Sequence, residues 1–405
     1  MRVTQSSNQS QFIAAIDALE SNLAQTQNQI STNLSFSTPS QNPVAAGAVD
    51  GYNQALAQST QYDSNANSAQ TRLSTEDSTL SQVQNALQSL RDLALQANSG
   101  TVSSADRSGI AAQATQIQAS LVSLANTQDG NGEYIFSGFK TQTQPFALSP
   151  TGATYSGDSG QRQLQIAAGQ SLADGDNGNT VFNQIKTGNG VFTATATPGN
   201  TGSGVLGATT VSNTAAYTGD TYVLTFKALP PSTTANAYDL KDTTTNTTVS
   251  GTYTDGQSIA FNGGQVTLTG QPAIGDTFSV APSTNQSIFT TVQNLITALQ
   301  SGGAASTSAS QAQLNNSING AINNIDQALN QTSNVRSSIG GRLNAITTQL
   351  SVSSSQQIQL QSSISSLQSL DYASAITKLD GQNTTLSAAL QAYTITQGLS
   401  LFKFL

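Results

Sequence analysis

Apolar residues near the N-terminus recur with the spacing of a coiled-coil seam. Successive members are separated by 4, 3, 4, 3 and 4 positions, which places them on one face of a helix. They are Phe12, Ile16, Leu19, Leu23, Thr26 and Ile30. A polar break follows at residues 31–40, and Asn42-Pro43 then offers an N-cap with proline at the first helical position. The pattern predicts two helices separated by this break.

A stronger seven-residue repeat follows and ends at a clear stop. Its members are Leu73, Leu80, Val83, Leu87, Leu90, Ala94 and Ala97. The Asn-Ser-Gly sequence at residues 98–100 ends the repeat, and Ser103 with Asp106 resembles a capping box in which Asp replaces Glu. The next helix carries Ile110, Ala114, Ile117, Leu121 and Leu124 on one face. Two long amphipathic helices joined by a short turn predict an antiparallel hairpin.

The period changes at residues 129–132, an Asp-Gly-Asn-Gly turn that leads into a predicted short strand at 134–136. Residues 145–282 are rich in Thr, Gly and β-branched side chains, which favour strands. Strands are predicted at 221–226 and 277–280, and the Asn-Gly-Gly sequence at 262–264 predicts a hairpin between 259–261 and 266–268. This region is expected to be a compact β-domain inserted between helical arms.

Helical periodicity returns after residue 285 with Ile288, Val292, Leu295 and Leu299, and a Gly/Ala/Ser linker is predicted at 301–310. The longest seam is Ile339, Leu343, Ile346, Leu350, Ser353, Gln357, Leu360, Ile364 and Leu367. Residues 343–370 contain no charged side chain, although a two-stranded coiled coil in water normally carries Glu and Lys beside its seam. Further helices are therefore expected to cover these flanks.

The chain ends with large apolar residues at five of its last seven positions, which are Leu399, Leu401, Phe402, Phe404 and Leu405. Chain ends are usually polar, so this tail is expected to be buried in an assembly or held by a partner. The predicted fold class is α+β, with long helical coiled-coil or bundle arms from both termini and an inserted β-rich domain. The expected divisions are 1–42 and 375–405 (terminal assembly helices), 43–144 (hairpin), 145–284 (β-rich domain) and 285–374 (C-terminal rod helices).

Composition narrows the function. The chain has no His and no Cys, which excludes a histidine base, a disulfide, a cysteine nucleophile and zinc held by imidazole or thiolate. Charged residues make up 8% of the chain and the net charge is −8, so a nucleic-acid groove is not expected. No secretory signal and no stretch of about 20 apolar residues is present, so membrane insertion is not expected.

Three local patterns fit chemical motifs only in part. Residues 202–207 match G-x-G-x-x-G without a following helix, and a loop is expected there. Asp174, Asp176 and Gly178 begin like a calcium loop, but Ile185 occupies the position that needs Glu, so a structural turn is expected. Residues 400–403 match S-x-x-K by chance. No catalytic, cofactor or metal residue is predicted.

Several longer stretches are more distinctive. Residues 124–141 read LANTQDGNGEYIFSGFKT, and residues 155–162 read YSGDSGQR and are followed by VFNQI at 181–185. The C-terminal part contains LDYASAI at 370–376 and QGLSLF at 397–402. These stretches resemble the hook-associated protein 3 family, the hook–filament junction members of the flagellin-like axial proteins. The resemblance covers residues 1 to about 185 and 275–405.

The resemblance implies a structural, non-enzymatic adaptor without a cofactor. It implies unfolded export through the flagellar type III apparatus without a cleaved signal peptide, and an extracellular place in the flagellum. The implied partners are further copies in a helical ring, hook-associated protein 1 on the hook side, flagellin or hook-associated protein 1-type neighbours on the filament side, and an export chaperone bound by the C-terminal helix. Residues expected at the assembly interface are Phe12, Ile16, Leu19, Leu23, Leu350, Ile364, Leu399, Leu401, Phe402, Phe404 and Leu405.

Two other functions remain open at this point. Flagellin itself shares the arrangement of helical arms around a β-rich middle. A non-flagellar adhesin would carry a β-domain on a coiled-coil stalk, but it would need an anchor or a secretion signal.

Overall fold

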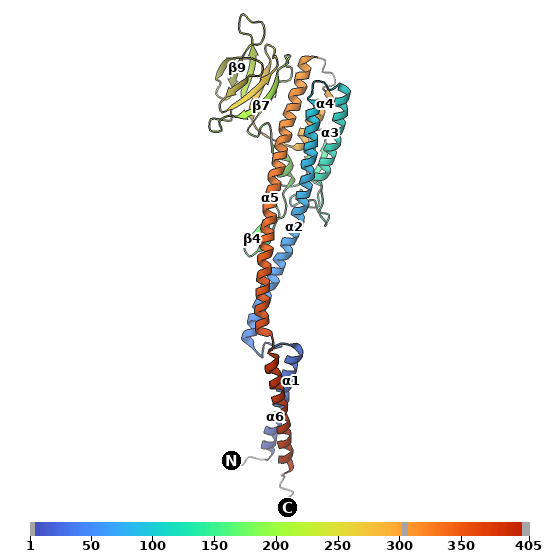
Figure 1. Ribbon diagram of the computed structural model, residues 1–405, viewed down its shortest axis with the longest axis vertical. Helices are drawn as coiled ribbons and strands as arrows, with labels where there is room; N and C mark the ends of the chain where they lie inside the picture. Colours follow the sequence, from blue (N-terminus) through green and yellow to red (C-terminus); the bar gives the residue numbers. More distant parts are fainter. Residues whose placement is uncertain (1–4, 302–306, 399–405) are drawn as a thin grey trace, which may run out of the picture. The chain divides into compact units, whose positions relative to one another are not determined.

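The computed structural model describes residues 5–301 and 307–398, which form two compact units (Figure 1). The terminal unit contains the described residues up to Ser64 and those from Thr348 onward. The central unit is Asn65–Thr347. Long helices at both ends of the sequence and a β-rich region between them confirm the predicted α+β class.

The helices begin and end largely where local sequence predicts. They are α1 (Gln5–Thr32), α2 (Pro43–Ala97), α3 (Ser104–Ala125), α4 (Ile288–Ser301), α5 (Ser308–Gln368) and α6 (Tyr372–Gly398). The Asn42 side chain accepts the N–H of Ala45 at 3.1 Å, as an N-cap should. The Ser103 hydroxyl accepts the N–H of Asp106 at 3.2 Å, which confirms the N-cap. The Asp106 carboxylate accepts from that hydroxyl at 2.7 Å, whereas in a capping box it would accept the backbone N–H of Ser103.

Two local predictions were wrong. Residues 134–136 form a turn in place of a strand, with only an isolated bridge between Tyr134 and Gln128. Ile135 and Phe136 are buried there, so the apolar run reflects burial of the turn. The predicted linker at 301–310 is shorter than expected because α5 already begins at Ser308, where the Thr307 hydroxyl accepts the N–H of Ser310 at 3.1 Å.

The strands form antiparallel sheets. They are β1 (Phe146–Ser149), β2 (Gly152–Tyr155), β3 (Gln163–Ala167), β4 (Gln170–Ala173), β5 (Ile185–Lys186), β6 (Phe192–Ala196), β7 (Val205–Val211), β8 (Tyr222–Lys227), β9 (Ala237–Asp242), β10 (Thr248–Thr252), β11 (Ser258–Phe261), β12 (Gly264–Thr269), β13 (Thr277–Pro282) and β14 (Asn285–Gln286). A five-stranded sheet has the order β10-β9-β8-β13-β6, and a three-stranded sheet has the order β11-β12-β7. Phe261 pairs with Gly264, which confirms the predicted hairpin.

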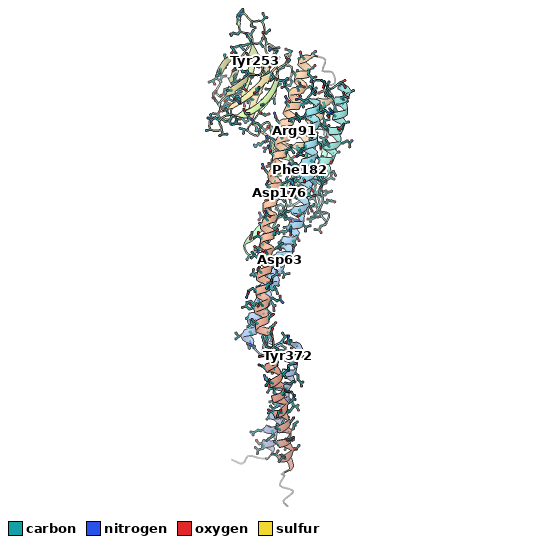
Figure 2. The ribbon with its side chains drawn as sticks, viewed as in Figure 1. Asp63, Arg91, Asp176, Phe182, Tyr253 and Tyr372 are labelled. Atoms are coloured by element: carbon teal, nitrogen blue, oxygen red, sulfur yellow. The ribbon has the colours of Figure 1, made fainter. Side chains whose placement is uncertain are left out.

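These two sheets share one aromatic and aliphatic core that runs in sequence from Phe192 to Val280. The Phe226 ring lies edge-on to Tyr253, with centroids 5.1 Å apart, and to Phe278 at 5.8 Å. Tyr253 is labelled in Figure 2. Both separations suit favourable edge-to-face packing. The period-2 burial of β8, β12 and β13 follows from one face of each strand pointing into this core.

The chain between α3 and β6 packs on the helices through a second aromatic cluster. The Phe146 ring of β1 lies 5.4 Å from Phe182 and 5.0 Å from Phe289, which belongs to α4. Phe182 lies in a π-helical turn, Asn179–Asn183, that no pattern in the sequence predicted. Phe136 adds an edge-on contact to Phe182 at 5.0 Å. This cluster fixes residues 136–182 to the helical part of the central unit.

Candidate assembly surfaces and a buried ion network

In the terminal unit α1 and α6 pack as an antiparallel pair. The Phe12 ring lies 6.3 Å from the ring of Tyr393, while the Tyr372 hydroxyl at the other end donates to the Ile30 carbonyl at 3.0 Å (Figure 2). The predicted seam residues Phe12, Ile16, Leu19 and Leu23 are half-buried and Thr26 is buried, so this face is the more covered one of α1.

The partner seam on α6 was missed by the sequence analysis. Its members alternate at spacings of 4 and 3 and are more covered than their neighbours: Ala375, Leu379, Gln382, Leu386, Ala389 and Tyr393. The heptad signal was present, but alanine and glutamine at three of its positions weakened the apolar pattern.

The predicted seam of α5 continues in the terminal unit with Leu350 and Ile364 half-buried. Ile364 packs against a small core made of Phe36, Ala45, Ala46 and Val49. The polar seam positions form their own layer, since the Ser353 hydroxyl bonds Ser59 at 2.8 Å and the Gln357 amide donates to Asp63 at 2.7 Å. The remaining expected residues, Leu399, Leu401, Phe402, Phe404 and Leu405, lie outside the described residues.

The same helices expose apolar side chains away from their seams. Val352 is 53% exposed and Ile358 is 69% exposed on α5, where no charged residue occurs between 343 and 370. Ile376, Leu390 and Ile395 of α6 are exposed by 46%, 43% and 64%. Within this single chain, the uncharged flanks predicted to be covered by further helices are therefore open to solvent.

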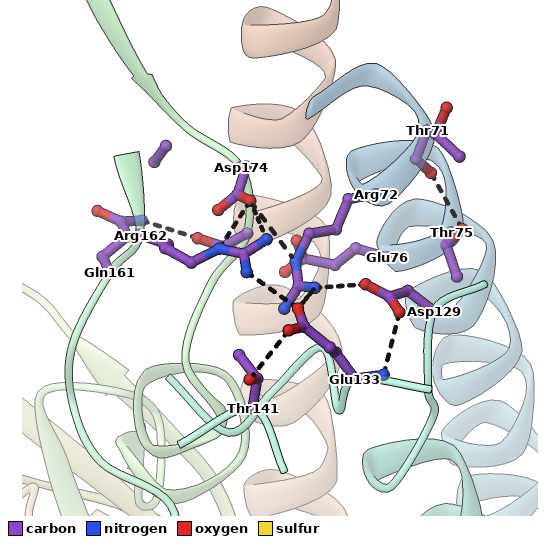
Figure 3. A network of polar contacts seen from close by, with 12 residues as sticks. Thr71, Arg72, Thr75, Glu76, Asp129, Glu133, Thr141, Gln161, Arg162 and Asp174 are labelled. Carbon is purple, nitrogen blue, oxygen red and sulfur yellow. Dashed lines mark hydrogen bonds and ion pairs between the residues drawn. The ribbon is translucent and has the colours of Figure 1, made fainter. Parts of the chain in front are cut away.

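The central unit contains a buried ion network that the sequence analysis also missed (Figure 3). Arg72 of α2 donates to Asp129 at 2.7 Å and to the Tyr134 carbonyl at 3.3 Å, and its side chain is only 7% exposed. Arg162 forms ion pairs with two carboxylates: its guanidinium lies 3.0 Å from Glu133, and it also donates to Asp174 at 3.0 Å. These ion pairs bind the turn at 129–132, the segment around Arg162 and the end of β4 to α2, although the four segments are far apart in sequence.

A second half of this network reaches α5. Asp176 follows the end of β4 in an irregular segment and pairs with Arg342 of α5, and the N–H of Asp176 donates to Glu76 of α2 at 3.2 Å. Residues 174–177 are an irregular segment in place of the structural turn expected there. Glu76 is fully buried, and its second carboxylate oxygen has no hydrogen-bond partner among the described residues. Burial first, and then the charge of Asp176, raise the pKa of Glu76 well above its usual value.

The network had a signal in the sequence. Asp129 and Glu133 lie in the 124–141 motif and Arg162 in the 155–162 motif, and charges are scarce in this chain. Because charged residues are rare in this chain, each one in a motif suggests a structural ion pair. The sequence does not tell which acid pairs with which base, since that depends on the tertiary fold.

Side-chain amides of α5 bind the backbone at the edge of the three-stranded sheet. Asn316 accepts the N–H of Leu206 at 2.7 Å and donates to the Gly204 carbonyl at 3.0 Å. Asn319 donates to the Leu206 carbonyl at 3.0 Å. Because β7 is an edge strand, these amides satisfy groups that another strand would otherwise pair. Residues 202–207 are thus a loop and the start of β7, as expected for a chance motif match.

The described residues contain no cluster of three or more acidic side chains able to hold a metal ion. Within 5–301 and 307–398, no helix has the length and hydropathy to span a membrane. The geometry found is that of packing faces and structural ion pairs.

Comparison with known proteins identifies the terminal helices. Residues 3–141 match the bacterial flagellin N-terminal helical region, and residues 322–405 match the bacterial flagellin C-terminal helical region. Flagellar hook-associated protein 3 of Escherichia coli K12 is 38% identical over 157 residues, which is 39% of this chain. That alignment spans about half, 49%, of the length of the curated relative.

Solved structures match over a longer range. The crystal structure of flagellar hook-associated protein 3 from Legionella pneumophila is 31% identical with a TM-score of 0.74, covering 79% of this chain and 98% of that one. The crystal structure of FlgL from Xanthomonas campestris is 32% identical with a TM-score of 0.70, covering 78% of this chain and 99% of that one. The chain therefore belongs to the flagellar hook-associated protein 3 (FlgL) family of flagellin-like proteins.

Proposed function

We propose that this chain is a structural subunit of the bacterial flagellum that forms the junction between hook and filament and is required for filament assembly and motility. The observation that carries the proposal is its identity of about one third with solved FlgL chains over nearly their whole lengths. A further solved FlgL chain, 33% identical to this one, is described as the flagellar junction protein of Legionella pneumophila. The proposed role is non-catalytic.

The exposed faces of the terminal unit support a role in assembly. Burying an apolar side chain such as Ile358 is favourable by about 1.5–3 kcal/mol, and because residues 343–370 carry no charge, burial of this face avoids the large desolvation cost of ions. Further copies in a helical ring would cover it. We place assembly contacts in residues 1–42 and 375–405 as well, including Leu399, Leu401, Phe402, Phe404 and Leu405 of the tail.

The partners follow from the position at the junction. They are further copies of the chain, hook-associated protein 1 on the hook side, and flagellin or a hook-associated protein 1-type neighbour on the filament side. Export proceeds through the flagellar type III apparatus, and a chaperone holds the C-terminal helix before assembly. The mature location is the extracellular flagellum.

Deleting the gene tests the function directly. Electron microscopy should show complete hooks without filaments, and flagellin monomers should accumulate in the medium. Hooks without filaments and without flagellin in the medium would instead identify this chain as the filament protein. Normal flagella in a strain with a single copy of the gene would contradict any essential flagellar role.

A further inference from the structure

Residues 137–139 and 155–160, from the two central sequence motifs, form a hydrogen-bonded cluster, the knot, around one exposed aromatic residue. Phe139 is 62% exposed, yet its N–H donates to the Asp158 carboxylate at 3.0 Å. The N–H of Gly160 donates to the same carboxylate oxygen at 2.7 Å. The Phe139 ring lies directly over Gly160, where an added Cβ would stand 2.0 Å from a ring carbon. Backbone and ring of Phe139 are therefore both fixed.

Further contacts join the two loops of this knot. The N–H of Asp158 donates to the Ser137 carbonyl at 3.1 Å, and the Tyr155 hydroxyl lies 2.7 Å from the Asp158 carbonyl. Gly138 has φ +70°, and a Cβ there would stand 2.3 Å from the Asp158 carboxylate. Only glycine fits such a close approach in this conformation. The knot needs specific residues at several positions, although the aromatic side chain it presents is in water.

An exposed aromatic held in one conformation has the properties of an interface anchor. Large aromatics supply much of the binding energy of protein interfaces, and fixing them beforehand removes the entropy cost of ordering them on binding. A purely structural reason for the knot would place the ring inside it, as it does for the neighbouring Phe136, which is fully buried.

Charge indicates the partner. Lys140 is exposed beside Phe139, and its charge acts on the Asp158 carboxylate that holds Phe139, without a close ion pair among the described residues. The arginines at 72, 91, 162, 336 and 342 are taken up in ion pairs within the chain. With 21 acidic and 13 basic residues in all, a second copy offers Lys140 an excess of carboxylates over cations.

We propose that Phe139, flanked by Lys140 and held by Asp158 and Gly160, is the anchor through which one copy of this chain binds a neighbouring copy. The contact is heterologous, because the anchor meets a different surface of the neighbour, as an arrangement around a ring or helix requires. This inference rests on the proposed function, since it concerns copies assembled at the junction.

A photo-crosslinking residue at position 139 of the full chain tests the contact in assembled flagella. Irradiation should give a product of about twice 41.7 kDa that contains only this chain. The matched control is the same probe at Val249, which is 64% exposed on β10 and should give at least fivefold less product. A product with a different flagellar protein, no product at 139, or equal yield from Val249 would overturn the proposal.

Substitution gives a second, independent measurement. Phe139→Ala should leave the melting temperature within about 1 °C, because the ring is mostly in water, while reducing incorporation into flagella about fivefold or more. Val249→Ala should change neither quantity. If immunogold labelling finds wild-type chains away from the hook–filament boundary, the proposed function and this contact both fail. Correct wild-type labelling with unchanged incorporation of Phe139→Ala refutes only the contact.

Discussion

At the scale of single residues, the buried Arg72 is the charge whose loss should destabilise the central unit most. Arg72 is 7% exposed, and it faces Asp129, Glu133 and Asp174. Removing one partner from such a network leaves the others buried without compensation, which costs more than the intact ion pair contributes. An exposed pair has no such penalty.

Arg72→Ala is therefore expected to lower the free energy of unfolding by about 3–5 kcal/mol. Arg91→Ala is a matched control, because Arg91 lies on the same helix and pairs with Asp326 at 2.6 Å, with both side chains more than one third exposed. The control should lose at most about 1 kcal/mol. Denaturant titration of the purified full chain measures both, and equal losses would show that the network is not a buried structural hub.

Glu76 gives the network a dependence on pH. Burial raises its pKa, so the folded state binds the proton more tightly than the unfolded state does. Its favourable contribution is complete below the unfolded pKa, near 4.5, and is lost as pH rises through the folded pKa.

Glu76→Gln removes this titration while keeping an oxygen for the N–H of Asp176. The variant should match wild type in acid and become more stable than wild type as pH rises, by about 1.4 kcal/mol for each unit by which the pKa is raised. Melting temperatures from pH 4 to 8 measure the effect. Glu20→Gln, at an exposed position on α1, should run parallel to wild type; a Glu76→Gln curve that also runs parallel would contradict the assignment.

At the scale of elements, the sequence predicts those features that depend only on neighbouring residues, such as helix caps and tight turns. The caps at Asn42 and Ser103, the stop after Ala97 and the hairpin at 262–263 all rest on neighbouring residues, and all are present. The turn at 134–136 was mistaken for a strand because its apolar residues are buried by a tertiary contact. The ion network and the exposed anchor at Phe139 were missed for the same reason, since each joins segments that are distant in sequence.

The side-chain amides of α5 show what uncharged polar residues do in this chain. Asn316 bonds both an N–H and a carbonyl near the start of β7. Asn316→Ala should leave these groups unpaired at a cost of about 1–3 kcal/mol, so that the Leu206 amide exchanges its hydrogen at least about tenfold faster.

Hydrogen exchange followed residue by residue measures this opening. Ser317→Ala is the control, because the Ser317 hydroxyl bonds only the Gln313 carbonyl of its own helix. Unchanged exchange at Leu206 in Asn316→Ala would mean that the edge of β7 is held by its other contacts, and the amides would then be secondary.

At the scale of the whole molecule, the low charge content and the exposed apolar side chains both favour assembly through the outer faces of the helices. The seams of α1, α5 and α6 are satisfied within the chain, so substitutions such as Leu350→Asp or Ile364→Asp would disturb its own packing as well as assembly. Substituting side chains that are exposed away from the seams tests assembly without disturbing the packing of the chain itself. Periodicity predicted the seams of α1 and α5 but neither the seam of α6 nor this division, because it does not tell which helix covers which face.

Ile358→Asp and Val352→Asp should therefore leave the isolated chain within about 0.5 kcal/mol of wild type, as surface changes usually do, yet prevent incorporation into flagella. A buried unpaired carboxylate in the assembled face costs several kcal/mol, which the interface cannot offset. Ile274→Asp, 57% exposed in the β-rich region, is the control and should incorporate normally. Because the three variants share charge and similar exposure, normal incorporation of Ile358→Asp would mean that this face of α5 stays in water in the flagellum, and the assembly contacts would have to lie on other faces of the chain.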